Sequence, residues 1–242
     1  MSAVLMYHYL GEPAPDDPHR GLWVPAGEFR EQLALLARMG RRTVTGAEYA
    51  AGLGTRALKN AVWLTFDDGR IDNYDAALPA LREAGARATF FVIAERSLGG
   101  AKDYIPLSCL REMVAAGMEI GSHTLTHPKL PRLSPAQLRD EIIGSKKRLE
   151  DALGIEVVSF CYPYGSLNNT ARELVREAGY RAAVSTIRDN RNGAADRFAL
   201  RRAMVQPGRT GLQFRYLFSP LYHWIHGYKN RRRWKKAIAD GS

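Results

Sequence analysis

Short apolar runs alternate with amphipathic segments of helical spacing, and this pattern constrains the fold of the chain more than any other feature. The apolar runs predict strands over residues 4–7, 62–66, 88–92, 118–121, 157–160 and 182–184. The amphipathic segments predict helices over residues 26–39, 72–84, 106–116, 134–153 and 168–178. Repeated strand–helix units build a parallel sheet, so we predict an α/β fold whose sheet is closed or nearly closed into a barrel.

Glycine and proline support the predicted helix ends. Gly40, Gly85 and Gly154 each follow directly on a helical pattern, where glycine is the usual C-terminal cap. Ser134-Pro135 places a capping serine before a proline that suits the first helical position. These capping signals predict the helix ends independently of the apolar pattern.

Charge separates the end of the chain from the rest. The chain has 242 residues and a hydrophobic content of 45%, enough for one large α/β domain with a core. Residues 207–242 contain eight lysines and arginines and one acidic residue, so they carry +7 of the net charge of +10. We therefore predict a barrel over residues 1–206 and a basic, aromatic tail over residues 207–242.

Two cysteines and the first residues of the chain bear on location. Cys109 and Cys161 are too few for a disulfide framework, which favours free thiols in a reducing compartment over a bridge. The first residues lack the basic and apolar regions of a signal peptide, and no run of 18 apolar residues occurs. We expect a cytoplasmic protein.

Two adjacent aspartates and two histidines are the candidate metal-binding residues of the sequence. Asp67 and Asp68 follow the apolar run over residues 62–66, and His123 and His127 lie four positions apart before Pro128. An Asp-Gly turn and ordinary structural histidines are the alternative interpretations of these residues. However, two acids at the end of a buried strand are costly without a cation nearby. Together the segments favour a metal site.

Two imidazoles and one carboxylate suit Zn²⁺ with open positions for water and substrate, although iron or another transition metal can use the same ligands. The second aspartate would remain as a base beside the metal, which is equipment for hydrolysing an amide or an ester. In addition, the candidate residues all follow predicted strands, where barrel enzymes place their active sites. They are His8, Asp67, Asp68, His123 and Tyr164.

Three segments resemble a known family. Thr65-Phe66-Asp67-Asp68-Gly69 and Ser122-His123-Thr124-Leu125-Thr126-His127-Pro128 look like the first two motifs of the polysaccharide deacetylases (carbohydrate esterase family 4, the NodB-homology domain), and Phe160-Cys161-Tyr162-Pro163-Tyr164-Gly165 resembles the third. The likeness covers about residues 2–206. It implies a distorted (β/α)7-type barrel, a divalent metal, and hydrolysis of N- or O-acetyl groups on sugars.

The resemblance also implies roles for individual residues. Asp67 would be the general base, and Asp68, His123 and His127 would be the metal ligands. The backbone N–H of Tyr164 would help to stabilise the oxyanion. All four carboxylate and imidazole positions are present, which argues against a catalytically inactive, carbohydrate-binding barrel.

The chain departs from the family pattern at two places. Many members carry an arginine where this chain has Cys161, so Arg201 or Arg202 is our candidate for the cation beside Asp67. The Leu-x-His motif that supplies the general acid is missing, and His223 and His226 lie in the basic tail. However, Met6-Tyr7-His8 resembles a circularly permuted subgroup that includes poly-N-acetylglucosamine deacetylases, in which an N-terminal histidine is the acid. His8 is therefore either that acid or a buried structural histidine.

The tail over residues 209–236 mixes aromatic with basic residues. One interpretation is a helix packed on the barrel with a solvated charged end, and another is peripheral contact with an anionic membrane, which would place the protein at the inner face. Nucleic acid is the least favoured partner, because the basic residues gather in the tail instead of spreading over a face of the fold.

The sequence as a whole predicts a metal-dependent hydrolase that removes N-acetyl or O-acetyl groups from a sugar or glycan in cell-surface glycan or exopolysaccharide biosynthesis. A deformylase or another amidohydrolase acting on a lipid-linked or nucleotide sugar remains the alternative.

Overall fold

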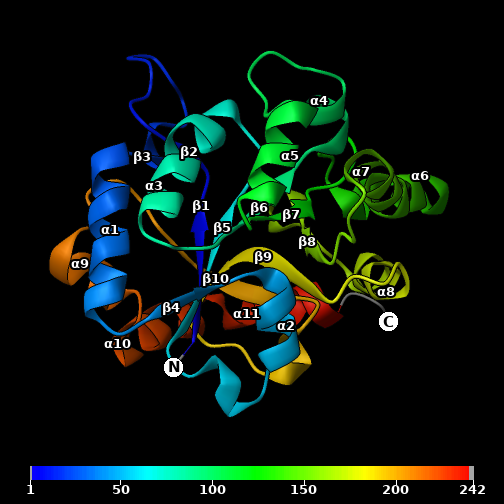
Figure 1. Ribbon diagram of the computed structural model, residues 1–242. Helices are drawn as coiled ribbons and strands as arrows, with labels where there is room; N and C mark the ends of the chain where they lie inside the picture. Colours follow the sequence, from blue (N-terminus) through cyan, green and yellow to red (C-terminus); the bar gives the residue numbers. More distant parts are fainter. Residues whose placement is uncertain (1, 240–242) are drawn as a thin grey trace.

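Seven parallel strands close into a barrel (Figure 1). The structure is a computed structural model that describes residues 2–239, apart from the side chains of residues 233 and 236–239. Around the barrel the order is β1-β10-β9-β8-β7-β6-β5, and β5 pairs again with β1. The strands are β1 (Ala3–Tyr7), β5 (Ala61–Phe66), β6 (Thr89–Val92), β7 (Glu119–Ser122), β8 (Ser159–Cys161), β9 (Ala182–Arg188) and β10 (Leu200–Met204). The predicted α/β barrel is confirmed.

Three further strands lie outside this ring. Strand β4 (Arg42–Val44) pairs with the first half of β5, while β6 pairs with its second half. Strands β2 (Tyr9–Leu10) and β3 (Trp23–Val24) form a separate parallel pair just after β1. The apolar pattern did not predict these short strands, because two or three residues are too few to show a period.

Helices surround the barrel, as Figure 1 shows. The α-helices are α1 (Ala26–Arg38), α2 (Gly46–Gly52), α3 (Leu78–Glu83), α4 (Ala94–Leu98), α5 (Leu107–Ala115), α6 (Pro135–Arg139), α7 (Ser145–Leu153), α8 (Asn169–Glu177), α9 (Gly211–Tyr216), α10 (Pro220–Tyr222) and α11 (Tyr228–Ala239). Three π-helical segments join them: η3 (Asn73–Ala77), η5 (Asp140–Gly144) and η8 (His223–Gly227). The short 3₁₀ turns are η1 (Arg20–Leu22), η2 (Arg56–Leu58), η4 (Leu130–Arg132), η6 (Pro163–Gly165) and η7 (Ala194–Asp196).

The predicted helix ends agree with the structure, and one predicted strand is shifted. Gly154 ends α7 in the left-handed conformation, and Ser134 caps α6 through its side chain. The strand predicted from residue 157 begins only at Ser159. Val157 instead donates its N–H to Glu150 and accepts from Lys146, so side chains of α7 occupy the groups that a strand neighbour would need.

Alternation along the strands divides the core into two parts. A smaller buried cluster inside the barrel includes Val4, Trp63, Cys161 and Leu200. A larger cluster, to which Leu5, Leu64 and Phe66 belong, packs between the barrel and its helices. Because the inward positions recur every second residue, β5 directs Thr65 and then Asp67 into the upper part of the barrel.

The residues after β10 contribute to the core. Phe214, Leu217, Phe218 and Tyr222 are buried in the larger cluster. Helices α10 and α11, drawn in red in Figure 1, continue the chain along the outside of the barrel. The domain boundary at residue 206 stays a prediction. None of the helices within residues 2–239 is long and apolar enough to cross a membrane.

Candidate active site

Three side chains at the ends of β5 and β7 converge on one point. Asp68 Oδ1 lies 3.4 Å from His123 Nε2 and 3.5 Å from His127 Nε2. The two histidine Nε2 atoms are 3.1 Å apart. Both loops begin directly at the ends of buried strands, so the barrel itself brings the acidic motif and the histidine motif together.

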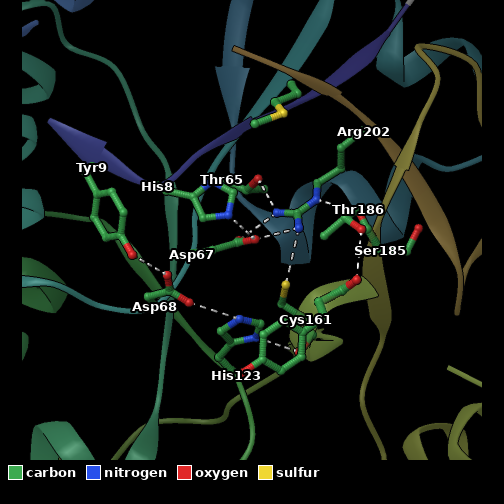
Figure 2. A network of polar contacts seen from close by, with 12 residues as sticks. His8, Tyr9, Thr65, Asp67, Asp68, His123, Cys161, Ser185, Thr186 and Arg202 are labelled. Carbon is green, nitrogen blue, oxygen red and sulfur yellow. Dashed lines mark hydrogen bonds and ion pairs between the residues drawn. The ribbon is translucent and has the colours of Figure 1, made fainter. Parts of the chain in front are cut away.

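Neighbouring groups orient these three side chains. The Nδ1 atom of His123 lies 2.8 Å from the carbonyl oxygen of Cys161 and donates to it, so Nε2 is the nitrogen that faces Asp68. Tyr9 donates its hydroxyl to Asp68 Oδ2 at 3.2 Å (Figure 2). The other oxygen, Oδ1, is therefore the one that faces the two histidines. Burial, followed by the nearby His123, lowers the pKa of His127 to about 4, so its imidazole is neutral at pH 7.

The loop that carries His127 is tight and is not helical. Thr124 and His127 both have positive φ angles, and the Thr124 hydroxyl accepts the N–H of His127. The buried carboxylate of Glu141, from the π-helical segment η5, accepts the N–H groups of Leu125 and Thr126, each at 2.9 Å. It also accepts the Thr126 hydroxyl at 2.6 Å. Three bonds to one buried acid therefore fix the turn.

Asp67 points into the barrel, where it meets Arg202 from β10. The guanidinium binds both carboxylate oxygens, each at 2.7 Å, in a bidentate ion pair (Figure 2). The other N–H groups donate to the Ser185 carbonyl, the Thr65 hydroxyl and the Cys161 sulfur. All five N–H groups of this fully buried side chain thus have an acceptor.

The ion pair sets the charge of the catalytic candidate. Burial alone would raise the pKa of Asp67, but the Arg202 guanidinium and its hydrogen bonds hold it below its ordinary value. Burial raises the pKa of the Cys161 thiol, so the sulfur beside Arg202 stays neutral. Asp67 is therefore an ionised carboxylate with its charge balanced inside the barrel.

His8 lies directly after β1, with its Nε2 atom 3.8 Å from Asp67 Oδ2. Burial lowers its pKa despite the adjacent Asp67 and Asp68 carboxylates. Its carbonyl accepts the side-chain amide of buried Asn73, and Asp72 accepts the N–H of Leu10. The first turn of the helix that follows the acidic motif therefore holds the segment that carries His8.

Tyr164 approaches the site from the turn after β8. Its backbone is left-handed, with φ of 58°, a conformation that tyrosine rarely adopts. The ring is 54% exposed and its centroid lies 4.6 Å from that of His127. Among the described residues, the other non-glycine residues with positive φ are Asn60, Asp68, Thr124 and His127. Four of these five positions belong to the site, and such strain gathers where function requires it.

The geometry fits a metal ion. Ligand atoms that bind a tetrahedral ion at 2.0–2.1 Å are about 3.3 Å from one another. The three distances between the donor atoms of Asp68, His123 and His127 range from 3.1 to 3.5 Å. A carboxylate oxygen and two imidazole nitrogens are suitable donors for Zn²⁺ and other transition metals. Asp68, His123 and His127 together form a group that could hold such an ion. Asp67, His123 and Cys161 form a second such group, but Arg202 already occupies its carboxylate and its sulfur.

The structure distinguishes the two candidate arginines. Arg202 faces inward and binds Asp67, whereas Arg201 faces outward and binds Asp189 and Asp196. Adjacent residues of a strand face opposite sides, so the sequence could have shown that only one of the two arginines faces inward. It could not show which one, because that depends on the phase of the strand. His223 lies in the C-terminal helix, where it contacts Asp189.

Sequence reasoning missed Tyr9, Glu141 and Asn73. Each residue either lies far along the chain from the group that it binds or belongs to an element of ordinary composition. No local sequence pattern therefore identified it as part of the site.

The fold and the site define an α/β barrel with a group of residues that could hold a metal ion, and the comparisons give its family. The family model for polysaccharide deacetylases matches residues 55–183, and the chain belongs to this family, whose members hydrolyse carbon–nitrogen bonds other than peptide bonds.

Individual relatives agree. The chain is 32% identical to YxkH of Bacillus subtilis (strain 168), which bears a polysaccharide-deacetylase name, over 87% of this chain and 74% of that protein. The matched part of the chain covers 22% to 54% of the length of several other curated relatives.

Two solved structures extend over nearly the whole fold. The Streptococcus pyogenes deacetylase PplD in complex with acetate is 29% identical with a TM-score of 0.85, covering 90% of this chain and 98% of that one. IcaB from Ammonifex degensii is 27% identical with a TM-score of 0.75, covering 89% and 96%. The likeness to IcaB agrees with the predicted relation to the permuted subgroup.

Proposed function

We propose that this protein is a metal-dependent deacetylase that hydrolyses N-acetyl groups on the amino sugars of a glycan. The observation that carries the proposal is the pairing of a three-ligand metal position with a charge-balanced carboxylate, Asp67, on the adjacent residue. The family supports hydrolysis of a sugar amide, and the acetate in the PplD structure supports an acetyl group.

Asp68, His123 and His127 would hold the ion, for which we propose Zn²⁺. When bound, a divalent ion supplies polarisation of the acetyl carbonyl and activation of a water molecule. Tyr9 and the Cys161 carbonyl keep two of the three ligands in the orientation that binding needs.

The remaining steps belong to side chains and backbone of this chain. Asp67, held ionised by Arg202, takes a proton from the attacking water. The backbone N–H of Tyr164 donates to the acetyl oxygen, which becomes negatively charged when water attacks the acetyl carbon. His8 delivers a proton to the leaving amine, and its separation of 3.8 Å from Asp67 allows the proton to pass between the two groups after a small shift. Water and amide thereby become acetate and amine.

We further propose that the substrate belongs to cell-surface glycan or exopolysaccharide biosynthesis and that the protein acts at the cytoplasmic face of a membrane. These finer assignments rest on the family, the free thiols of Cys109 and Cys161, and the basic C-terminal segment.

An acetate-release assay tests the function. The Zn²⁺-loaded protein would be incubated with chito-oligosaccharides, poly-N-acetylglucosamine oligomers, a nucleotide sugar and a lipid-linked glycan, with and without chelator. We expect chelator-sensitive acetate release from at least one of them, and Asp67→Asn should nearly abolish it while metal remains bound. Formate release from N-formyl analogues in place of acetate would assign a deformylase. Metal and glycan binding without turnover would assign an inactive binding barrel.

A further inference from the structure

Exposed apolar side chains gather in the C-terminal helices. Among the described residues, the large hydrophobic side chains that are exposed are Tyr164, Leu212, Leu221, Trp224 and Tyr228. Tyr164 belongs to the active site, and the other four lie between residues 212 and 228. Trp224 is 72% exposed and Tyr228 is 77% exposed, although both are large enough to be buried in most folds.

Three of these residues share one stripe of a continuous helix. Helix α10, the π-helical segment η8 and helix α11 follow one another without a break from Pro220 to Ala239. Leu221, Trp224, Ile225 and Tyr228 recur at intervals of three or four residues, so they lie on one face of this helix. We call these four residues the aromatic ridge.

The opposite face of the same helix is used by the fold. Tyr222 is buried in the core, and the side chain of Asn230 donates to the carbonyl of Arg188 at the end of β9. Trp234 lies against the Arg201 guanidinium, whose carbon is 5.1 Å from its ring centroid. The barrel therefore holds the helix in one rotation, and that rotation leaves the aromatic ridge facing outward.

Positive charge continues from the ridge. Lys229, Arg231, Arg232 and Lys235 are exposed on the next turns of the helix, and the sequence contains no acidic residue between positions 197 and 239. A hollow of about 420 Å³ between helix and barrel is lined by Arg188, Arg201, Arg231 and Lys235 together with aromatic rings. Arg201 is paired with Asp189 and Asp196, so the apolar rings share this surface with the positive charges of Lys229, Arg231, Arg232 and Lys235.

We propose that the aromatic ridge and the adjacent basic residues dock this protein onto the surface of a membrane that carries anionic lipid. Tryptophan and tyrosine prefer the interface between headgroups and acyl chains, where their apolar rings are buried and their polar atoms stay hydrated. Lysine and arginine near the surface add attraction to anionic headgroups. A helix that combines an apolar face with basic residues in this way lies in the plane of the membrane interface.

The composition of the ridge favours lipid over two other partners. Bases of a single-stranded nucleic acid stack on aromatic rings, but Leu221 and Ile225 offer no such platform and suit acyl chains. A second copy of this chain would bring two strongly positive surfaces together, and their repulsion would oppose the contact.

Vesicle sedimentation with the full chain tests the proposal, which is independent of the chemistry of the active site. We expect the protein to bind vesicles of phosphatidylcholine mixed with phosphatidylglycerol, to bind pure phosphatidylcholine much more weakly, and to dissociate in high salt. Trp224→Ser combined with Tyr228→Ser should weaken binding at least about tenfold through lost apolar burial. Arg231→Gln combined with Arg232→Gln should weaken it roughly 25-fold, about fivefold for each charge.

The matched control removes the same charge elsewhere. Arg82→Gln combined with Arg139→Gln changes two exposed arginines on α3 and α6, and binding should stay within about twofold of wild type. Circular dichroism and thermal unfolding verify that all variants fold.

Equal binding of wild type and both ridge variants, or equal binding to neutral and anionic vesicles, would overturn the proposal. Ridge-dependent binding of a labelled oligonucleotide, or ridge-dependent dimerisation in sedimentation velocity, in the absence of vesicle binding would overturn it as well and would identify the other partner.

Discussion

Replacing Arg202 by methionine would leave the Asp67 carboxylate inside the barrel without its cation. The Asp67 side chain is 2% exposed and Arg202 is fully buried, so water cannot substitute for the lost guanidinium. The substitution would also remove the donors to the Thr65 hydroxyl and the Ser185 carbonyl. Methionine fills a similar volume, so the effect would come from charge and hydrogen bonding more than from a cavity.

The expected cost is large. Removing one partner of a buried ion pair typically destabilises a protein by about 3–5 kcal/mol, because the other charge is left uncompensated. The pKa of Asp67 would rise as well, since burial raises it and Arg202 is the main group that lowers it. A larger fraction of the Asp67 carboxyl would then be protonated, and a protonated carboxyl cannot act as a base. We expect both a lower free energy of unfolding and lower turnover.

Urea unfolding and acetate release measure the two effects. Arg202→Met should lower the free energy of unfolding by about 3–5 kcal/mol, whereas Asp67→Leu combined with Arg202→Met should recover most of the stability and none of the activity. Arg202→Lys keeps the charge but offers three donors in place of five, so activity should fall by about 10- to 100-fold with a smaller loss of stability.

Arg201→Met is the control on the same strand, because Arg201 binds Asp189 and Asp196 outside the barrel. Its turnover per folded molecule should match that of wild type. Unfolding of Arg202→Met at the wild-type urea midpoint, or a double variant less stable than Arg202→Met alone, would show that the ion pair does not balance a buried charge.

Three other substitutions test the supporting residues. Glu141→Ala should weaken Zn²⁺ binding by about 10- to 100-fold, because it releases the loop that carries one of the ligands, while the exposed Glu177→Ala should leave the affinity unchanged in the same titration. Asn73→Ala should lower kcat without a matching loss of bound metal, since its amide holds the His8 carbonyl; a proportional loss of metal would contradict this. Burial raises the pKa of Asp72 from 3.8 to about 6, so ionisation is harder in the folded than in the unfolded state. Wild type should therefore lose up to about 3 kcal/mol of stability as pH rises between these values, and urea unfolding of Asp72→Asn should lack this slope if the assignment is right.

The order of strands and helices, and the residues at the strand ends, could be predicted because they depend on local patterns. Asp67, Asp68 and His123 lie directly after the predicted strands, and a parallel barrel brings such positions together whatever the rest of the sequence. The choice between Arg201 and Arg202 needed the phase of β10, that is, which of its residues face into the barrel, and the sequence does not give this phase. A shift of one residue exchanges the inward and outward faces.

Other features depend on contacts that no local pattern encodes. Tyr9 reaches Asp68 across 59 positions of the chain, and Glu141 accepts from a loop 15 and 16 positions before it. The C-terminal segment combines buried residues such as Phe214 with exposed ones such as Trp224. Its composition alone favoured no single interpretation, because the sequence does not show which face of a helix the barrel covers.

Metal titration of the purified, metal-free protein shows whether Asp68, His123 and His127 hold an ion. We expect one Zn²⁺ bound per chain by calorimetry, loss of that binding in Asp68→Ala and in His123→Ala, and retention of binding without turnover in Asp67→Asn. Undiminished binding in both ligand variants, or acetate release by a metal-free protein, would rule out this metal site.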